Sequence, residues 1–383
     1  MNASRRFFLR SVGLGAAASG TVRWPLLESS TGARVESVPR RKDGGYVLLN
    51  SNENAYGPSS RVDAAIRSAM GKANRYAFAS YHEVVEQIAR SHRVKPNQVL
   101  LGCGSTEILR AASCAFLGSR RQLIQGSPTY EAMEEYARAV ESEVVSVPLD
   151  RHFAHDLQAM QAKWTASTGL VYICNPHNPT ASTTPRLDLE SFIGRLPATA
   201  RILIDEAYHH YAIPSETYAS FIDRPLADER VIVTRTFSAV YGLAGLRLGY
   251  AVAAPKVVEQ MRRYITLDTL NSVVAEAAIV ALDDVDGVKA FVKRNSDDRQ
   301  EFYNSAMIRM LMPISSQANF VMTDTQHPAD EVIEHFRRHN ILIGRRFPPM
   351  DSFTRVSLGT PPEMRAFWQV WDMLPWAKLF MHH

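Results

Sequence analysis

Residues 234–250 read TRTFSAVYGLAGLRLGY, and the rest of the chain can be organised around this stretch. It continues an apolar run, Val231–Thr234, that is typical of a buried strand. Three glycines then allow the backbone to turn tightly and to pass close to a bound group: Gly242, Gly245 and Gly249. Between residues 99 and 250, strand-like runs alternate with helical patterns, which predicts a mostly parallel sheet covered by helices. Such sheets bind ligands where their strands end, so a ligand site is expected here.

The length and composition are those of an ordinary globular α/β protein. With 383 residues, the chain is long enough for two domains or one large unit. The net charge of +4 is spread along the chain without a dense basic block, which argues against a nucleic-acid partner. The three cysteines, Cys103, Cys114 and Cys174, lack metal-ligand spacing, so we expect no metal site. Cys103 and Cys174 lie in apolar stretches and are expected to be small core residues and not a disulfide.

The N-terminus has the order of an export signal. Residues 4–10, SRRFFLR, resemble a twin-arginine signal, and a short apolar run rich in Ala and Gly follows at residues 11–20. Ala16–Ala18 offers a small-residue cleavage site. The alternative is a disordered basic tail. The first interpretation predicts an exported, periplasmic protein, so residues 1–30 are left out of the fold prediction. Beyond them, no run of about twenty apolar residues predicts a membrane span.

A second motif, VLLGCGSTE at residues 99–107, predicts a strand, a glycine turn and the start of a helix. Gly102 and Gly104 permit the tight turn. Ser105 and Thr106 are favourable capping residues, and we expect them to cap the helix. Free backbone N–H groups and the positive end of the helix dipole would then suit a phosphate.

Together these motifs resemble those of fold-type I pyridoxal phosphate (PLP) aminotransferases, closest to the histidinol-phosphate aminotransferase branch. The resemblance covers about residues 48–367. It rests on the order of these sequences along the chain: LNSNENAYGP (49–58), GCGSTE (102–107), PTY (128–130), NPHNPT (175–180), DEAY (205–208), the opening stretch and RVSLGT (355–360). Four positions depart from the family pattern, and each of them is an alanine. Ala55 and Ala77 replace prolines, Ala181 replaces a glycine, and Ala239 replaces a lysine.

The resemblance implies an α/β fold in two domains and a homodimer. A large PLP-binding domain, residues 76–270, would contain the mostly parallel sheet covered by helices. A smaller α/β domain would comprise residues 271–383, and an N-terminal arm, residues 31–75, would join it. In the family, the active sites lie at the interface between the two subunits.

The resemblance also implies a role for each motif residue. Asp205 would pair with the protonated ring nitrogen of PLP, and Tyr130 would stack on the ring. The remaining implied cofactor contacts are Asn178 and Tyr208 at the phenolic oxygen, and Gly104, Ser105, Thr106, Ser238 and Arg247 around the phosphate. The implied substrate contacts are Asn54, Tyr76 (from a neighbouring subunit), Asn319, Arg355 at the α-carboxylate, and either Arg345 or Arg346 at a substrate phosphate. His209 and His210 are expected to be loop or substrate-pocket residues and not metal ligands.

Ala239 stands where the family has the lysine that carries PLP as a Schiff base. That lysine also moves the proton between the substrate Cα and the cofactor, and alanine can do neither. Two explanations are open. A lysine-to-alanine substitution made deliberately would trap PLP and a substrate amine as a stable external aldimine; alternatively, this is a natural lysine-free member. We favour the first, because the neighbouring residues keep the family pattern.

The predicted function is that of a PLP-dependent aminotransferase in the parent protein and of a catalytically impaired form in this chain. The parent would transfer an amino group between an amino acid, or a related amine, and a 2-oxo acid. The alternatives are a PLP-dependent decarboxylase of the same fold and a non-catalytic periplasmic binder of PLP or of an amino acid. Since histidine synthesis is cytoplasmic, an exported protein is not expected to serve it, and histidinol phosphate is not taken as the substrate.

Overall fold

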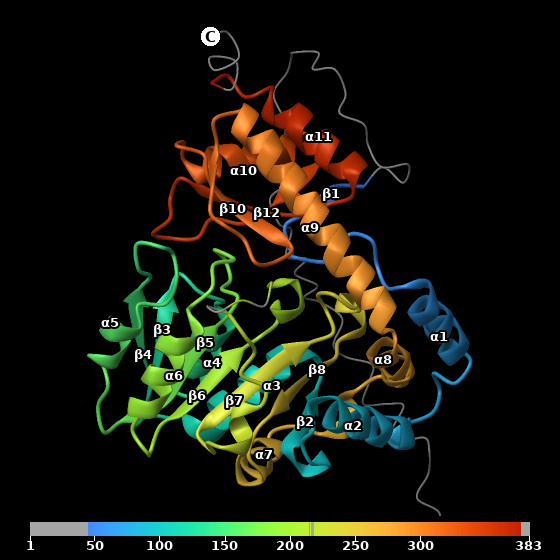
Figure 1. Cartoon of the computed structure of the whole chain (residues 1–383), viewed down its shortest axis with the longest axis vertical. Coiled ribbons are helices and arrows are strands. Elements are labelled where there is room, and N and C mark those ends of the chain that lie inside the picture. The colour runs from blue at the N-terminus through green and yellow to red at the C-terminus, as the bar shows by residue number, and fades with distance from the viewer. Residues whose placement is uncertain (1–44, 214, 216–217, 377–383) are drawn as a thin grey trace, which may run out of the picture. The chain divides into compact units, whose positions relative to one another are not determined.

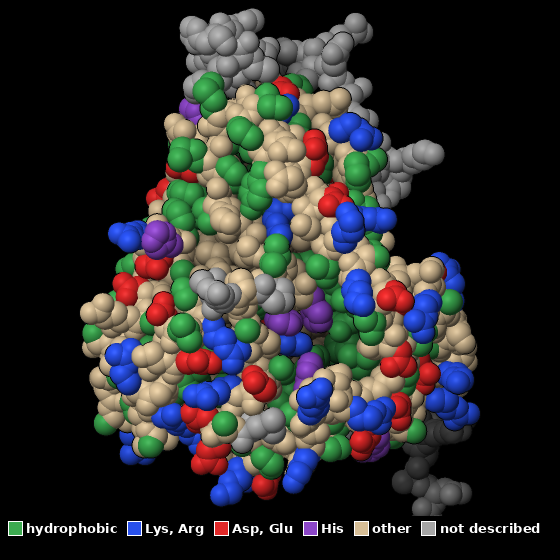
Figure 2. All heavy atoms as spheres, in the orientation of Figure 1, with side chains coloured by type: hydrophobic (Ala, Val, Ile, Leu, Met, Phe, Trp, Pro, Cys, Tyr) green, Lys and Arg blue, Asp and Glu red, His purple; other side chains and the backbone are tan. Residues whose placement is uncertain are grey.

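A computed structural model describes residues 45–213, 215 and 218–376 (Figure 1). The predicted export signal lies outside the described residues, which all belong to one compact unit. Among them, no helix is both long enough and apolar enough to cross a bilayer. Positive and negative side chains are interspersed over the lower part of the face shown in Figure 2 and do not separate into regions of one sign.

A seven-stranded sheet forms the centre of the larger part, in the order β2-β8-β7-β6-β5-β3-β4. Only β8 is antiparallel to its neighbours. The strands are β2 Val99–Gly102, β3 Gln122–Ser127, β4 Glu143–Pro148, β5 Thr168–Cys174, β6 Arg201–Asp205, β7 Val231–Thr236 and β8 Gly249–Val252. Every residue of β5 is buried, as expected for a parallel strand that is covered on both faces.

Helices cover both faces of this sheet (Figure 1). Side chains alternate between the faces along each strand: Leu170 and Tyr172 of β5 pack in one apolar cluster, and Val171 and Ile173 pack in another. The first cluster includes α3 Gly104–Phe116, α4 Ala132–Ala139 and α7 Pro255–Arg262. The second includes α5 Leu157–Gln161 and α6 Arg186–Arg195. A third cluster, at the β2–β8 end, includes α1 Ser60–Met70, α2 Phe78–His92 and α8 Ser272–Asp283.

The remaining strands form two small sheets. β1 Val47–Leu49 pairs in parallel with β11 Ile341–Ile343. β10 Phe320–Asp324 lies between β12 Phe353–Ser357 and β9 Met312–Pro313, antiparallel to both. These sheets share a core with α10 Ala329–Arg338 and α11 Pro361–Trp371, in which Phe336 stacks on Phe367.

The long helix α9, Val285–Ile308, joins the two parts (Figure 1). It contacts the short helix η3 near the large sheet at one end, and β9 and α11 at the other. Asn295 and Arg299, which are buried on α9, both donate to the Ala318 carbonyl oxygen before β10. The short 3-10 helices are η2 Pro96–Gln98, η3 His209–Tyr211, η4 Arg224–Leu226, η5 Ala244–Leu246 and η6 Leu267–Thr269.

The predicted mostly parallel sheet covered by helices is confirmed. The predicted arm joins the small sheets through β1, but α1 and α8 pack against the large sheet. The predicted boundaries at 75 and 270 instead assign α1 to the N-terminal arm and α8 to the small domain. The division into two domains stays a prediction.

Candidate active site

A cavity of about 550 Å³ lies where the parallel strands end, which is the usual ligand position in open α/β sheets. Its walls come from three places. The large sheet and its loops contribute most of the predicted cofactor residues: Ser105, Thr106, Tyr130, Asn178, Asp205, Tyr208, Ser238 and Arg247. The smaller sheets contribute Arg355 and Arg345, and the segment after β1 contributes residues 50–52.

One part of the cavity wall is a cluster of donors around Arg247. Its guanidinium lies 3.2 Å from Thr106 Oγ1 and 3.4 Å from Ser238 Oγ. Gly104 has φ of +75° and lies so close to Arg247 that a Cβ at this position would overlap the guanidinium. A Cβ on Gly249 would likewise overlap the backbone of Ser105. The two glycines therefore let the start of α3 and Arg247 converge on one point, with the helix N–H groups available to an anion.

The predicted capping of α3 is wrong. The helix begins at Gly104, its N-cap is Cys103, and no side chain caps it there. Ser105 and Thr106 lie inside the first turn, where their hydroxyls line the cavity. Glu107 instead accepts a hydrogen bond from the Cys103 N–H at 2.7 Å. A carboxylate in the first turn also matches the positive end of the helix dipole.

Asp205 lies at the end of β6 and is 3% exposed. Tyr172 donates to its carboxylate at 2.9 Å, Thr234 at 3.3 Å and the Ala207 N–H at 3.1 Å. Burial raises its pKa from 3.8 to about 6, although these three donors oppose the shift. Asp205 is therefore a carboxylate on the cavity wall that a cationic group would stabilise.

Another part of the cavity wall centres on Arg355. One Nη donates to Asn178 Oδ1 at 2.7 Å, and the other donates to the Asn50 carbonyl at 2.7 Å. Its buried Nε has no hydrogen-bond partner among the described residues, and no ion pair of Arg355 occurs among them. Burial lowers the pKa of Arg355. A buried guanidinium with an unused donor and no carboxylate is suited to bind an anionic group.

Tyr208 lines the cavity as well. Its hydroxyl accepts a hydrogen bond from Asn52 Nδ2 at 3.0 Å and lies 3.5 Å from Asn178 Nδ2. Tyr130 also lines the cavity, and burial, with the charges of Asp205 and Glu131, raises its pKa to about 12. Burial raises the pKa of Tyr208 as well. Both phenols are therefore neutral at ordinary pH and can donate.

Ala239 lines the same cavity and is 4% exposed. It packs with Tyr211 and Val240. None of the lysines in the described part of the chain lines the cavity, so no amine there replaces a lysine at position 239.

Three predicted substrate residues do not line this cavity. Asn319 donates to the carbonyls of Asn52 and Glu53, at 2.9 and 3.1 Å, and Asn54 donates to the Val240 carbonyl at 3.1 Å. Both side chains hold the loop after β1 in place. Tyr76 is 72% exposed and stacks on Phe78. Their predicted contacts with substrate stay predictions.

The structure separates the two candidate arginines before Phe347. Arg345 lines the cavity, whereas Arg346 does not and forms ion pairs with Asp330 and Asp351 at 3.2 and 2.8 Å. Sequence reasoning missed Glu131, which also lines the cavity and forms an ion pair with Arg345 at 2.6 Å. Its position directly after Tyr130 was the available signal.

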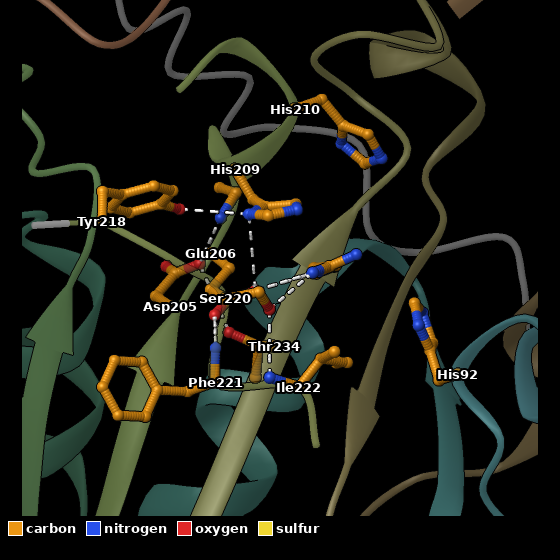
Figure 3. Close-up of polar contacts among 12 residues, drawn as sticks. His92, Asp205, Glu206, His209, His210, Tyr218, Ser220, Phe221, Ile222 and Thr234 are labelled. Carbon is orange, nitrogen blue, oxygen red and sulfur yellow. Dashed lines mark hydrogen bonds and ion pairs between the residues drawn. The ribbon is translucent and has the colours of Figure 1, made fainter. Parts of the chain in front are cut away.

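Glu206 follows Asp205 in the chain but has different partners (Figure 3). It forms a buried ion pair with Arg235 at 2.9 Å and accepts from Ser220 at 2.7 Å. His209 and His210 lie beside this pair and do not line the cavity, contrary to the pocket role considered for them. Burial lowers the pKa of both, that of His209 to about 3. No group of described residues is arranged to hold a metal ion.

Comparison with known proteins defines the class of this α/β protein. Residues 45–370 match the profile of the family described as aminotransferase class I and II. The chain belongs to this family, whose fold-type I architecture the large sheet and its helices show.

Several individual members of this family are similar to the chain over most of its length. The chain is 31% identical over 342 residues to histidinol-phosphate aminotransferase of Moorella thermoacetica, covering 88% of this chain and 87% of the relative. It is 32% identical over 330 residues to aromatic amino acid aminotransferase of Rhodococcus erythropolis, covering 86% and 90%. Among solved structures, histidinol-phosphate aminotransferase of Sinorhizobium meliloti in complex with pyridoxal-5'-phosphate has a TM-score of 0.81 and 25% identity, covering 91% of this chain and 98% of that one.

Proposed function

We propose that the cavity holds PLP and that the chain, with lysine at position 239, transfers an amino group between an α-amino acid and a 2-oxo acid. The observation that carries the proposal is that one cavity combines the buried carboxylate of Asp205 with two sites suited to anions, the Arg247 cluster and Arg355. This set of groups matches a molecule with a phosphate, a cationic ring and an attached carboxylate. When bound, PLP supplies an aldehyde for the amine and an electron-poor ring that takes up the electron pair released at Cα.

The cluster around Arg247 would hold the phosphate. The Arg247 guanidinium lies within 3.4 Å of both the Ser238 and the Thr106 hydroxyl, so these donors need little rearrangement. No side chain caps the start of α3, so the first backbone N–H groups of this helix can donate to a phosphate. The residues present therefore fit a phosphate.

Asp205 would hold a proton at the ring nitrogen. Its pKa of about 6 without a cationic partner falls when a ring N–H is beside it, because the opposite charge favours the ionised form. Tyr172 and Thr234 fix the carboxylate in place. Tyr208 and Asn178 would donate to the phenolic oxygen, and Tyr130 would cover one ring face.

Arg355 would orient the substrate. Its unpaired Nε makes it able to take an α-carboxylate without breaking an existing ion pair. Asn178 and the Asn50 carbonyl hold the guanidinium in position. A fixed carboxylate places Cα at a defined distance from the cofactor.

Ala239 limits this chain to binding. A methyl group cannot form the covalent link to an aldehyde, and it cannot carry a proton from Cα. The chain as given is therefore proposed to be catalytically impaired. Whether the alanine is natural or was introduced does not change this consequence.

The proposal is tested by comparing the chain with its Ala239→Lys and Ala239→Met variants. After addition of PLP, an amino acid and a 2-oxo acid, we expect a new keto acid only from Ala239→Lys. Ala239→Met is the control, since it supplies a long side chain without an amine. Release of carbon dioxide in place of amino transfer would identify a decarboxylase.

A non-catalytic binder is the second candidate, because Ala239 itself favours it. It predicts the same PLP affinity in the chain and in Ala239→Lys, with no turnover by either.

We also propose that the protein forms a homodimer, because homodimers are usual in the family. Light scattering can measure the mass of the assembly.

A further inference from the structure

Glu131 and Arg345 form an ion pair on the wall of the cavity. Glu131 precedes α4 of the large sheet, and Arg345 follows β11 of the small one. Two contacts join the side chains, at 2.6 Å between Arg345 Nη2 and Glu131 Oε2 and at 3.2 Å between Nε and Oε1. Each side chain is about half exposed, at 48% and 47%. This fork geometry is the strong form of an arginine–carboxylate contact.

A shared aromatic ring places Arg345 near Arg355. The Arg345 guanidinium lies 4.3 Å from the centre of the Phe347 ring, and that of Arg355 lies 4.9 Å from it. Both charges of the pair act on Arg355: Arg345 lowers the pKa of Arg355, and Glu131 raises it. The pair is therefore close enough to interact electrostatically with a group that binds at Arg355.

The charged residues that line the cavity can be divided by whether PLP and an α-carboxylate would neutralise them. The charged lining residues are Asp205, Arg247, Arg355, Glu131 and Arg345. In the proposed function, a phosphate neutralises Arg247, a cationic ring neutralises Asp205, and an α-carboxylate neutralises Arg355. Glu131 and Arg345 are left to meet the substrate side chain, and they already neutralise each other. Ile333 and Ile343 line the same cavity with apolar surface.

We propose that Glu131 and Arg345 select amino donors whose side chain carries no charge. A side-chain anion would have to displace Glu131 from Arg345, and a side-chain cation would have to displace Arg345 from Glu131. An uncharged side chain leaves the pair intact. This inference rests on the proposed function, because it assumes that PLP and an α-carboxylate occupy the rest of the cavity.

The test compares charged donors with uncharged donors of similar side-chain length. In the Ala239→Lys background, kcat/KM is measured for glutamine against glutamate, and for norleucine against lysine. We expect the uncharged member of each pair to be preferred by about tenfold, the effect of one unfavourable charge contact of modest size. Glu131→Gln should raise glutamate relative to glutamine by about tenfold, and Arg345→Gln should raise lysine relative to norleucine by about as much.

Glu135→Gln is the matched control. Glu135 is an exposed acid on α4 that does not line the cavity, so its loss should change neither preference by more than about twofold. High salt should reduce both gains, since the pair is half exposed. A background enzyme that uses glutamate as well as glutamine, or a Glu131→Gln variant without the gain, would overturn the inference.

Binding separates this inference from the proposed function. Calorimetry with the same four amino acids on the PLP-loaded chain that keeps Ala239 needs no turnover. If Ala239→Lys transfers no amino group but binding keeps the predicted order, the proposed reaction fails and the inference stands. Binding without that order overturns the inference whatever the reaction proves to be.

Discussion

Two neighbouring carboxylates at the end of β6 show how strongly surroundings decide what a residue does. Asp205 lines the cavity with neutral donors around it. Glu206 is paired with Arg235, and Figure 3 shows His209 close to Glu206. Asp205 is therefore available to pair with a cationic ligand. Glu206 is already compensated and serves the fold.

Asp205 predicts a pH-dependent stability in the cofactor-free protein. Its pKa is raised from 3.8 to about 6, so the folded state binds the proton more tightly, and stability falls as pH rises through this window. The loss is on the order of 3 kcal/mol at most. Asp205→Asn should remove it. Urea unfolding at pH 4 and pH 7 measures both proteins, and an equal pH dependence in the two would contradict the assignment.

Removing Arg235 should be costly, because it leaves Glu206 buried without its partner. We expect Arg235→Ala to lower the free energy of unfolding by about 3–5 kcal/mol. The control is Arg138→Ala, which breaks an exposed pair with Glu134 and should cost less than about 1 kcal/mol. Denaturant unfolding measures both. Similar losses in the two variants would show that the buried pair is not structural.

The roles of single residues differ in how far the sequence predicts them. Asp205 follows an apolar strand inside a short motif, and its position on the cavity wall was predicted. The pair of Glu131 and Arg345 was not, because its members are 214 residues apart and only the packing of the small sheets brings them together.

At the scale of elements, the phosphate end depends on the approach of α3 to β8. Gly104 and Gly249 allow that approach, and Arg247 adopts a left-handed backbone conformation between them, with φ of +60°. Neither strand nor helix alone forms the site. The register of the β2–β8 pair, in which Gly102 lies opposite Gly249, sets the distance between β8 and the start of α3.

Gly104→Ala should therefore abolish phosphate-dependent binding. We expect PLP affinity to fall by at least about a hundredfold, because the new methyl group displaces the Arg247 guanidinium. Gly57→Ala is the matched control: its φ of +72° imposes the same backbone strain, but no atom lies within 4 Å of the new methyl group. It should lose about 1–2 kcal/mol of stability and keep its PLP affinity. Equal losses of PLP affinity in Gly104→Ala and Gly57→Ala would contradict the proposed phosphate site around Arg247.

Most elements could be predicted from periodicity. Apolar residues recur at helical spacing in residues 60–70, 272–283 and 361–371, and the structure has α1, α8 and α11 there. The antiparallel direction of β8 could not be predicted, because four buried residues carry no signal of direction. The predicted cap of α3 was wrong because the helix begins at Gly104, which places Ser105 and Thr106 inside the first turn and Cys103, whose side chain does not cap the helix, at the N-cap.

At the scale of the whole molecule, the cavity needs both the large and the small sheets. Arg247 and Asp205 come from the first, and Arg355 and Arg345 come from the second. Their convergence explains why the motifs are spread from residue 49 to residue 360. Composition and alternation predicted the sheet, but only the ordered set of motifs predicted which residues converge.

Export of the whole protein is a separate proposal, since residues 1–30 lie outside the described residues. The run SRRFFLR supports a twin-arginine signal. Changing both Arg5 and Arg6 to Lys should keep the protein in the cytoplasm, whereas the unchanged chain should reach the periplasm. Cell fractionation and immunoblotting measure this, and an unchanged distribution would favour a plain basic tail.

The most direct test of the cofactor site is to reduce each protein with borohydride after PLP has been added, and to locate the modified residue by peptide mass spectrometry. In Ala239→Lys, we expect a single pyridoxyl adduct at position 239, because the phosphate cluster and Asp205 hold the aldehyde beside it. In the chain as given, no lysine should be modified selectively. An adduct on the same distant lysine in both proteins, or none at position 239, would contradict the proposed site.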